Sequence, residues 1–279
     1  MMTVVKVLAA LIVLAALGGT AVLVERLKEE STVPRLREVK LEGSTVEPDE
    51  IAFERAREFL ATGQFEEARV KLEFIVTLYP GSPSAAEGRR ILGELNLDDL
   101  LSTEVMDGKV MYTVKSGDNF TKIARQHETT LDCIMHMNGL QRMDKLYPGN
   151  ELVLLPLNFN IKIDVPRKRL SLFREGHFLK AYQLLSARTR RGAKGTLRSK
   201  IGQKIGISNG SRISPVRHES YRVAQKVLIL DHQGLQLREV VEADEENSGR
   251  GFFLSESDME ELALLLRVGN EVEVRFINK

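Results

Sequence analysis

The sequence predicts an α+β multidomain chain with four parts in series. Three observations predict it: an uncharged apolar run near the N-terminus, helical periodicity of apolar residues through 50–101, and short runs of alternating apolar residues after residue 157. Between the last two lies a segment whose pattern is strand, helix, helix, strand. We therefore expect a membrane helix, a small α-helical segment, a small mixed module and a mainly-β C-terminal domain.

Composition sets limits on the chemistry. A length of 279 residues favours two domains or three small ones. The single cysteine, Cys133, excludes an internal disulfide framework and a zinc cluster built on cysteines. The histidines form no HxH or HExxH pair, and no glycine-rich stretch has the spacing of a phosphate loop. We predict no metal site and no cofactor, and we expect Cys133 to be packed rather than reactive.

Residues 1–30 are predicted to form a signal anchor. Val7–Val24 contains no charge over 18 residues, which is near the lower limit for a helix that spans a bilayer. The alternative is a signal peptide cleaved after Ala21, although the apolar run continues past that point. Residues 31–49 have prolines, a glycine and scattered charges with no clear period, so we expect a linker there.

Residues 50–101 are predicted to be helical, with apolar stripes interrupted at Gly63 and Pro80. The pattern resembles one tetratricopeptide repeat with an extra helix, on the residues Ala56…Gly63-Gln64-Phe65-Glu66-Glu67-Ala68…Leu72…Tyr79-Pro80. The resemblance implies a small surface for docking a protein or for self-association. Because repeat arrays generally need about three units to bury a continuous core, a helical spacer is the alternative.

The module at 111–156 has signals for each of its elements. In order, we expect a strand at Met111–Val114, a helix at about 119–127, a helix that starts at Thr129, a turn at Tyr147–Asn150 and a strand at Glu151–Leu155. Gly117 can take a positive φ in the first turn, and Asp118 can cap the first helix. Asp132, three residues after Thr129, gives a weaker form of the capping box.

These residues resemble the LysM module, a small βααβ carbohydrate-binding domain. The resemblance lies in Tyr112-Thr-Val-Lys-Ser-Gly-Asp118, Ile123-Ala124, Asn138-Gly-Leu140 and Leu146-Tyr-Pro-Gly149. It implies binding to N-acetylglucosamine-containing glycans, chiefly peptidoglycan, in a shallow groove between the loop after the first strand and the loop before the second. Carried over, the glycan-binding residues would be Gly117, Asp118, Asn119, Phe120, Asn138, Gly139 and Leu140. Phe120 stands where the family usually has leucine, and it can fill the core or stack on a sugar.

Residues 157–279 are predicted to be β-rich with one late helix. Gly176 and the segment Asp231–Gly234 mark two hairpin turns, and Arg222–Leu230 is predicted as a strand. Ser255 and Asp258 form a capping box for a helix that reaches about Leu266. A final strand is expected at 272–276.

This domain resembles an L,D-transpeptidase domain at its opening, Ile161-Lys-Ile-Asp-Val165…Arg169-Leu-Ser-Leu-Phe173, and at its closing segment, Arg250-Gly-Phe-Phe-Leu-Ser-Glu-Ser-Asp258. In active members of the family the closing segment starts Ser-His-Gly-Cys-X-Arg, and the cysteine is the nucleophile. This chain has Asn247-Ser-Gly-Arg-Gly-Phe-Phe253 there. The resemblance implies a related β-sandwich, while the missing cysteine and histidine argue against its chemistry. Ser248, Ser255 and His218 are poor alternatives, because no serine has a histidine at the motif's spacing.

A basic strip crosses the first half of the C-terminal domain. Residues 162–226 hold 17 lysines and arginines against three acidic residues. Such a strip attracts polyanions, and the residues assigned to polyanion binding are Arg188, Arg190, Arg191 and Lys194. The alternative is a solvated loop whose charge the acidic run Asp244–Glu246 matches. Since 192–210 is rich in Gly, Ser and Lys, we expect a mobile excursion there.

Together these features predict a non-catalytic cell-envelope protein, anchored in the inner membrane or secreted if the anchor is cleaved, that faces the periplasm or cell wall. Its expected partners are peptidoglycan glycan strands, the membrane, and a protein docked on the helical segment, with no nucleic acid. The alternatives are a diverged peptidoglycan-modifying enzyme and an envelope scaffold in which the helical segment does the main work.

Overall fold

The computed structural model describes residues 47–142, 146–232, 234–240 and 249–276. The predicted anchor and almost all of the predicted linker lie outside these residues. Among the residues it describes, no helix has both the length and the apolar character needed to cross a membrane. The part of the chain from Glu47 onward forms a single compact unit.

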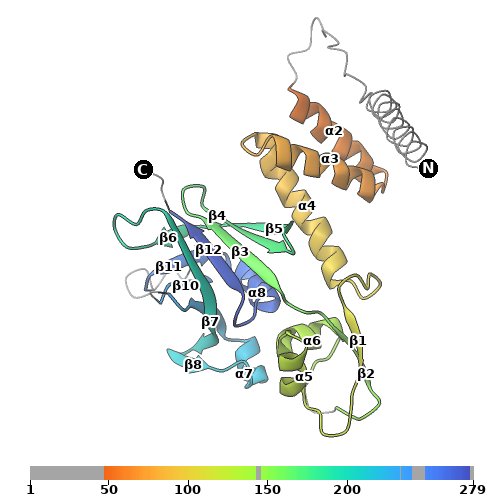
Figure 1. The fold of residues 1–279 in the computed structure, drawn as a ribbon, viewed down its shortest axis with the longest axis vertical. Helices are drawn as coiled ribbons and strands as arrows, with labels where there is room; N and C mark the ends of the chain where they lie inside the picture. The colour runs from red at the N-terminus through yellow and green to blue at the C-terminus, as the bar shows by residue number, and fades with distance from the viewer. Residues whose placement is uncertain (1–46, 143–145, 233, 241–248, 277–279) are drawn as a thin grey trace, which may run out of the picture. The chain divides into compact units, whose positions relative to one another are not determined.

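Three helices open this unit (Figure 1): α2 at Pro48–Ala61, α3 at Phe65–Leu78 and α4 at Pro83–Leu101. Gly63 has φ +74° in the turn between α2 and α3, a conformation that glycine adopts without strain. Ser82 caps α4, since its side chain accepts the Ala85 N–H at 3.1 Å. The helical segment is confirmed as helical, although α2 begins at Pro48, inside the predicted linker.

The module that follows has the predicted order. Its elements are β1 at Val110–Thr113, α5 at Phe120–Gln126, α6 at Leu131–Met137 and β2 at Glu151–Leu154. Strands β1 and β2 pair antiparallel. Two predicted caps are wrong by one residue: Asn119 caps α5 and Thr130 caps α6. The Asp118 carboxylate already accepts hydrogen bonds from other donors, and Thr129 is buried.

The C-terminal domain is a strongly connected sheet with two helices. Its elements are β3 Phe159–Asp164, β4 Arg169–Arg174, β5 His177–Gln183, β6 Ser186–Arg188, β7 Thr196–Ser208, β8 Ser211–Ile213, α7 His218–Arg222, β9 Gln225–Leu230, β10 Gln236–Glu239, β11 Gly251–Leu254, α8 Glu256–Leu265 and β12 Glu271–Arg275. The strand order is β5-β4-β3-β12-β7-β9-β10-β11-β6, and β8 pairs with β7. The predicted hairpin at Gly176 and the Ser255 cap of α8 are both present.

Two predictions for this domain are wrong. The expected mobile excursion at 192–210 is mostly the strand β7, which hydrogen-bonds to β12 over its first part and to β9 over its second. The expected strand from Arg222 begins only at Gln225, because His218–Arg222 forms the short helix α7. In the sheet β7 lies between β12 and β9, and Figure 1 shows β7 as a long strand beside β12.

One hydrophobic core joins the three parts of the unit. Leu97 and Leu100 of α4, and Cys133 and Met137 of α6, belong to the same buried cluster as the strands of the C-terminal sheet. The prediction that Cys133 is packed is confirmed, since its side chain has no exposed surface. Burial raises the pKa of its thiol to about 11, so it carries no thiolate at neutral pH.

Candidate functional site

The two loops that the resemblance assigns to glycan binding lie side by side. Val114, at the end of β1, donates its N–H to the Asn150 carbonyl at 2.8 Å and accepts the Gly149 N–H at 2.9 Å. These bonds clamp the turn that follows β1 against the turn that precedes β2. The result is an exposed edge of the module made from both loops.

Asp118 is a structural anchor of this edge. Its carboxylate accepts the Tyr112 hydroxyl at 2.6 Å, the Lys115 N–H at 2.9 Å and the Lys122 ammonium at 3.0 Å. The side chain is only 3% exposed. These donors, the Tyr112 hydroxyl first, hold the pKa of Asp118 well below its usual range. The carboxylate therefore fixes the first loop and has little surface left for a ligand.

Asn138 is also committed to the fold. Its amide donates to the carbonyls of Ile134 and Val153, each at 2.8 Å, and its side-chain oxygen accepts the Val153 N–H at 2.8 Å. The side chain thus ties the C-terminal end of α6 to β2. Phe120 is buried in the core of the module, so its ring fills the core and is not placed to stack on a sugar.

The remaining predicted residues lie on the surface or at its edge. Gly117, Asn119 and Gly139 are exposed, and Leu140 is half-buried against the core of the module. Asn119 uses its side-chain oxygen to cap α5, accepting the Lys122 N–H at 2.9 Å, so its amide nitrogen can still face a ligand.

Tyr147 is a candidate that the sequence analysis did not assign. It stands in the turn before β2, and 59% of its surface is exposed. An exposed aromatic side chain offers both an apolar face and a hydroxyl, which suits a sugar. The signal was present in the sequence, because an aromatic residue within a Pro-Gly turn has no core position to fill.

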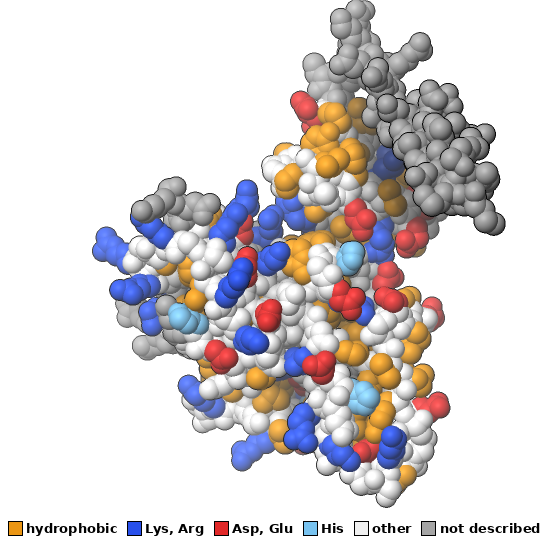
Figure 2. All heavy atoms as spheres, viewed as in Figure 1, with side chains coloured by type: hydrophobic (Ala, Val, Ile, Leu, Met, Phe, Trp, Pro, Cys, Tyr) orange, Lys and Arg blue, Asp and Glu red, His pale blue; other side chains and the backbone are white. Residues whose placement is uncertain are grey.

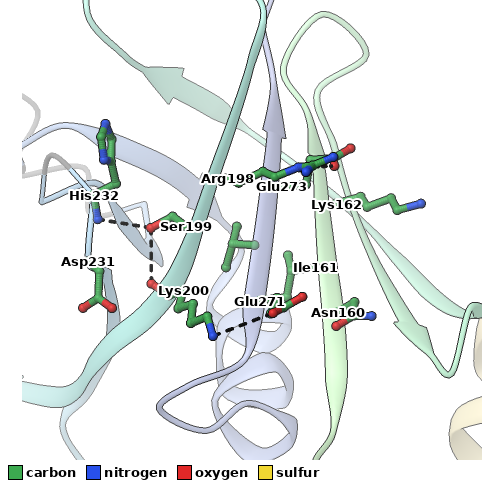
Figure 3. Close-up of a pocket in the computed structure, with 11 residues that line it drawn as sticks. Asn160, Ile161, Lys162, Arg198, Ser199, Lys200, Asp231, His232, Glu271 and Glu273 are labelled. Atoms are coloured by element: carbon green, nitrogen blue, oxygen red, sulfur yellow. Dashed lines mark hydrogen bonds and ion pairs between the residues drawn. The ribbon is translucent and has the colours of Figure 1, made fainter.

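The C-terminal sheet has an open polar face, drawn in Figure 3. A pocket of about 690 Å³ lies over β3, β12 and β7. Its charges pair across neighbouring strands, Lys200 with Glu271 at 3.7 Å and Arg198 with Glu273 at 3.6 Å. These are exposed pairs, of the kind that contributes little to stability. Figure 2 shows the same mixture of positive and negative side chains over this face.

Ser199 and His232 meet at this pocket without forming a catalytic pair. The contact between them joins the backbone N–H of His232 to the Ser199 hydroxyl at 3.1 Å. Figure 3 shows the imidazole of His232 pointing away from Ser199. A histidine acts as a base toward a serine only through its ring nitrogens, so this arrangement does not activate the hydroxyl.

The segment that resembles the transpeptidase closing segment packs into the core where it is described. Phe252, Phe253 and Leu254 are fully or almost fully buried in β11. The Ser255 hydroxyl accepts the Asp258 N–H at 3.1 Å and caps α8. Ser248 lies outside the described residues. Ser255 therefore has a structural role, and no hydroxyl of this described stretch is poised as a nucleophile.

His218 is the first residue of the short helix α7. Its Nε2 lies 3.5 Å from Oδ1 of Asp132, which comes from α6 of the module. Burial lowers the pKa of His218 from its ordinary value, although the charge of Asp132 opposes this shift. Burial therefore favours the neutral imidazole. The tertiary structure alone brings these two residues together.

The four residues assigned to polyanion binding lie on or beside the loop between β6 and β7. Arg190, Arg191 and Lys194 are exposed around a pocket of about 380 Å³, while the guanidinium of Arg188 lies 4.9 Å from the centre of the Phe253 ring. The acidic run proposed to neutralise this loop lies outside the described residues. Figure 2 shows Lys and Arg side chains gathered at this end of the sheet.

Comparison with known proteins identifies one domain. The family model for the LysM domain matches residues 112–154, so the βααβ module is a LysM domain. No curated protein matches the chain.

Solved structures similar to this chain include L,D-transpeptidases. One is the L,D-transpeptidase (Yku) from Stackebrandtia nassauensis, with 17% identity, TM-score 0.32, and coverage of 53% of this chain and 66% of that one. L,D-transpeptidase 1 from Mycobacterium tuberculosis has 13% identity and TM-score 0.30, with coverage of 42% of this chain and 62% of that one. An L,D-transpeptidase from Mycobacterium smegmatis has 11% identity and TM-score 0.30, with coverage of 46% of this chain and 64% of that one. The chain thus spans slightly less than two thirds of the length of these proteins.

Proposed function

We propose that the chain is a non-catalytic cell-envelope protein that binds N-acetylglucosamine-containing glycans, chiefly those of peptidoglycan, through its LysM domain. The observation that carries this proposal is the LysM match at 112–154, whose two clamped loops form an exposed edge. The N-terminal apolar run would hold the protein in the inner membrane, with the LysM domain on the periplasmic or wall side.

The proposed contact residues are those that the fold leaves exposed or, for Leu140, half-buried. Gly117 and Asn119 would meet the glycan from the first loop, Gly139 and Leu140 from the loop after α6, and Tyr147 from the turn before β2. Asp118, Phe120 and Asn138 would act indirectly, because their polar or apolar groups are already used within the domain. A test that mutates those three would confuse binding with folding.

The test is co-sedimentation of the full chain with purified peptidoglycan sacculi at low and high salt. We expect wild-type protein to sediment under both conditions, and Tyr147→Ala to bind about tenfold more weakly, a change of about 1.4 kcal/mol. Phe65→Ala is the matched control, since Phe65 is also an exposed aromatic, 53% exposed, but lies on α3. It should bind as wild type does.

The salt arm separates the LysM edge from the basic loop. Contacts between exposed charges are screened by salt, so binding through Arg190 and Arg191 would vanish at high salt. It would also fall in an Arg190→Gln/Arg191→Gln variant and stay unchanged in Tyr147→Ala. That combination would refute the LysM edge as the main site. Failure of the wild-type chain to sediment at either salt concentration would refute wall binding altogether.

The alternative of a diverged peptidoglycan-modifying enzyme has one specific observation in its favour. His218 beside Asp132 borders a pocket of about 710 Å³. However, none of the described residues that line this pocket is serine, threonine or cysteine, so no hydroxyl or thiol nucleophile stands beside the histidine there. Incubation with muropeptides should give no turnover. Turnover that disappears in His218→Gln would establish the enzyme instead.

A scaffold role for the helical segment is the third candidate. Helices α2 and α3 expose Ile51, Phe65, Val70 and Leu78, and Figure 2 shows hydrophobic side chains gathered over these helices. Exposed apolar patches often mark interaction surfaces. If sacculi fail to sediment the chain, a protein partner on this surface becomes the leading function.

A further inference from the structure

A pocket of about 710 Å³ opens beside the LysM domain and continues from its glycan-binding loop. Along α6 it is lined by Asp132, Met135 and His136, which share one helical face at i, i+3, i+4 spacing, and Gly139 lines it from the turn after α6. The opposite wall comes from α7 and α8 of the C-terminal domain. Gly139 therefore belongs both to this wall and to the loop that we assign to glycan binding.

Most charges of the pocket are already neutralised by neighbours. Asp132 accepts the buried Lys204 ammonium at 2.9 Å, and Lys226 donates to Glu260 at 2.7 Å. Glu261 pairs with Lys180 at 2.9 Å. The three ion pairs each combine one positive and one negative side chain, so together they are polar but carry no net charge.

Arg222 is the exception among the residues that line this pocket. Its guanidinium is exposed on α7 and makes no hydrogen bond or ion pair with the part of the chain that is described. The side chain of its neighbour His218 is buried, and its Nε2 lies 3.5 Å from Oδ1 of Asp132. A guanidinium binds carboxylates through two parallel hydrogen bonds, which makes it selective for that group.

We propose that this pocket binds the carboxylate-bearing stem peptide attached to a glycan held by the LysM domain, with Arg222 binding a peptide carboxylate. The inference rests on the proposed function, because it requires the glycan to lie on the loop at Gly139. A glycan on that loop places its substituents at the mouth of the pocket. A volume of about 710 Å³ lies within the range of ligand pockets and suits a few amino acid residues.

The test compares three soluble ligands by calorimetric titration of the full chain. They are an N-acetylglucosamine tetramer, a disaccharide-peptide muropeptide with free carboxylates, and the same muropeptide with its carboxylates amidated. We expect the free muropeptide to bind more tightly than the amidated one. Arg222→Gln should weaken binding of the free muropeptide about tenfold, the size of one charge-assisted hydrogen bond. It should leave the other two ligands unchanged.

Arg212→Gln is the matched control, because it removes an exposed arginine from β8, outside the pocket. It should bind all three ligands as wild type does. Equal affinity of wild type for the free and amidated muropeptides, or loss of tetramer binding in Arg222→Gln, would overturn the pocket while glycan binding stands. Absence of wild-type binding to both the tetramer and the muropeptides would overturn the proposed function and the pocket together.

Discussion

Asp118 illustrates how one side chain can look functional in a sequence and be structural in the fold. It sits in the loop that the LysM resemblance assigns to glycan binding, yet its two oxygens accept three hydrogen bonds from within the domain. Asn138 behaves in the same way through its links to Ile134 and Val153. At both positions the side chain holds the neighbouring backbone in place through hydrogen bonds within the domain and contributes little of the exposed edge itself.

Asp118→Asn should lower the melting temperature of the full chain by a few degrees at pH 7. The pKa of Asp118 is lowered in the folded chain, whereas an aspartate in the unfolded chain has a pKa of about 4. The carboxylate's contribution is therefore complete above about pH 4 and is lost as the pH falls through the folded pKa. The difference between variant and wild type should shrink below about pH 4, in thermal unfolding followed across pH.

Asp98→Asn is the control for this experiment, because Asp98 is exposed on α4 and its carboxylate has no partner among the described residues. It should melt as wild type does at every pH. A difference for Asp118→Asn that stays constant from pH 7 down to about pH 2 would contradict the assignment of its stabilising role to the ionised carboxylate.

At the scale of the element, β7 shows why composition alone gave the wrong answer. Its Gly, Ser and Lys content resembles a loop, but its backbone bonds to β12 on one side and to β9 on the other. The pairing register shifts between Ile201 and Gln203. The buried residue before the shift is the odd-numbered Ile201, whereas those after it are the even-numbered Lys204 and Gly206. This bulge breaks the simple alternation by which a strand is recognised in a sequence.

Gly251 in β11 is predicted to tolerate no side chain. A Cβ at this position would lie 2.1 Å from the backbone oxygen of Gln236, on the neighbouring strand β10. Because that contact is with backbone inside a parallel pair, relief requires the strands to move. Gly251→Ala should reduce the free energy of unfolding by about 1–3 kcal/mol in chemical denaturation, the usual size of an overpacking penalty.

The matched substitution is Gly81→Ala, between α3 and α4, where a Cβ would meet nothing within 4 Å. Its backbone is outside the positive-φ region, so alanine there should be neutral or slightly stabilising. If Gly251→Ala unfolds at the same denaturant concentration as wild type, the close approach of β10 and β11 is not as the structure has it.

At the scale of the whole unit, the LysM domain and the C-terminal domain are joined by a buried ion pair as well as by a shared core. Lys204 of β7 is 8% exposed and donates to Asp132 of α6 at 2.9 Å, and also to the carbonyl of Ala263 in α8. His218 adds a third polar group to this contact. The pair fixes three elements that lie far apart in sequence.

Lys204→Met should cost about 3–5 kcal/mol of unfolding free energy, because it leaves the Asp132 carboxylate partly buried without its partner. The double variant Lys204→Met/Asp132→Leu should lose less than the sum of the two single losses, which a double-mutant cycle in chemical denaturation measures. Lys200→Met is the control on the same strand, since Lys200 is exposed and pairs with Glu271 only at 3.7 Å. Additive losses in the cycle would contradict a direct Lys204–Asp132 interaction.

The sequence by itself determined the βααβ module, the helical character of residues 50–101, the hairpin at Gly176 and the Ser255 cap of α8. These features are local, since turn residues, caps and periodicity act within a few residues along the chain. The same locality made the LysM motif recognisable and brought Gly117, Asn119, Gly139 and Leu140 into the candidate site.

Only the tertiary structure decided which candidate residues are free to bind. It buried Phe120, left little of the Asp118 side chain exposed, left Tyr147 exposed, turned 196–208 into a central strand, and placed His218 beside Asp132. The physical reason is that burial, hydrogen-bond satisfaction and charge pairing depend on residues distant in sequence. Lys204 and Asp132 are 72 residues apart, and no local pattern records that they meet.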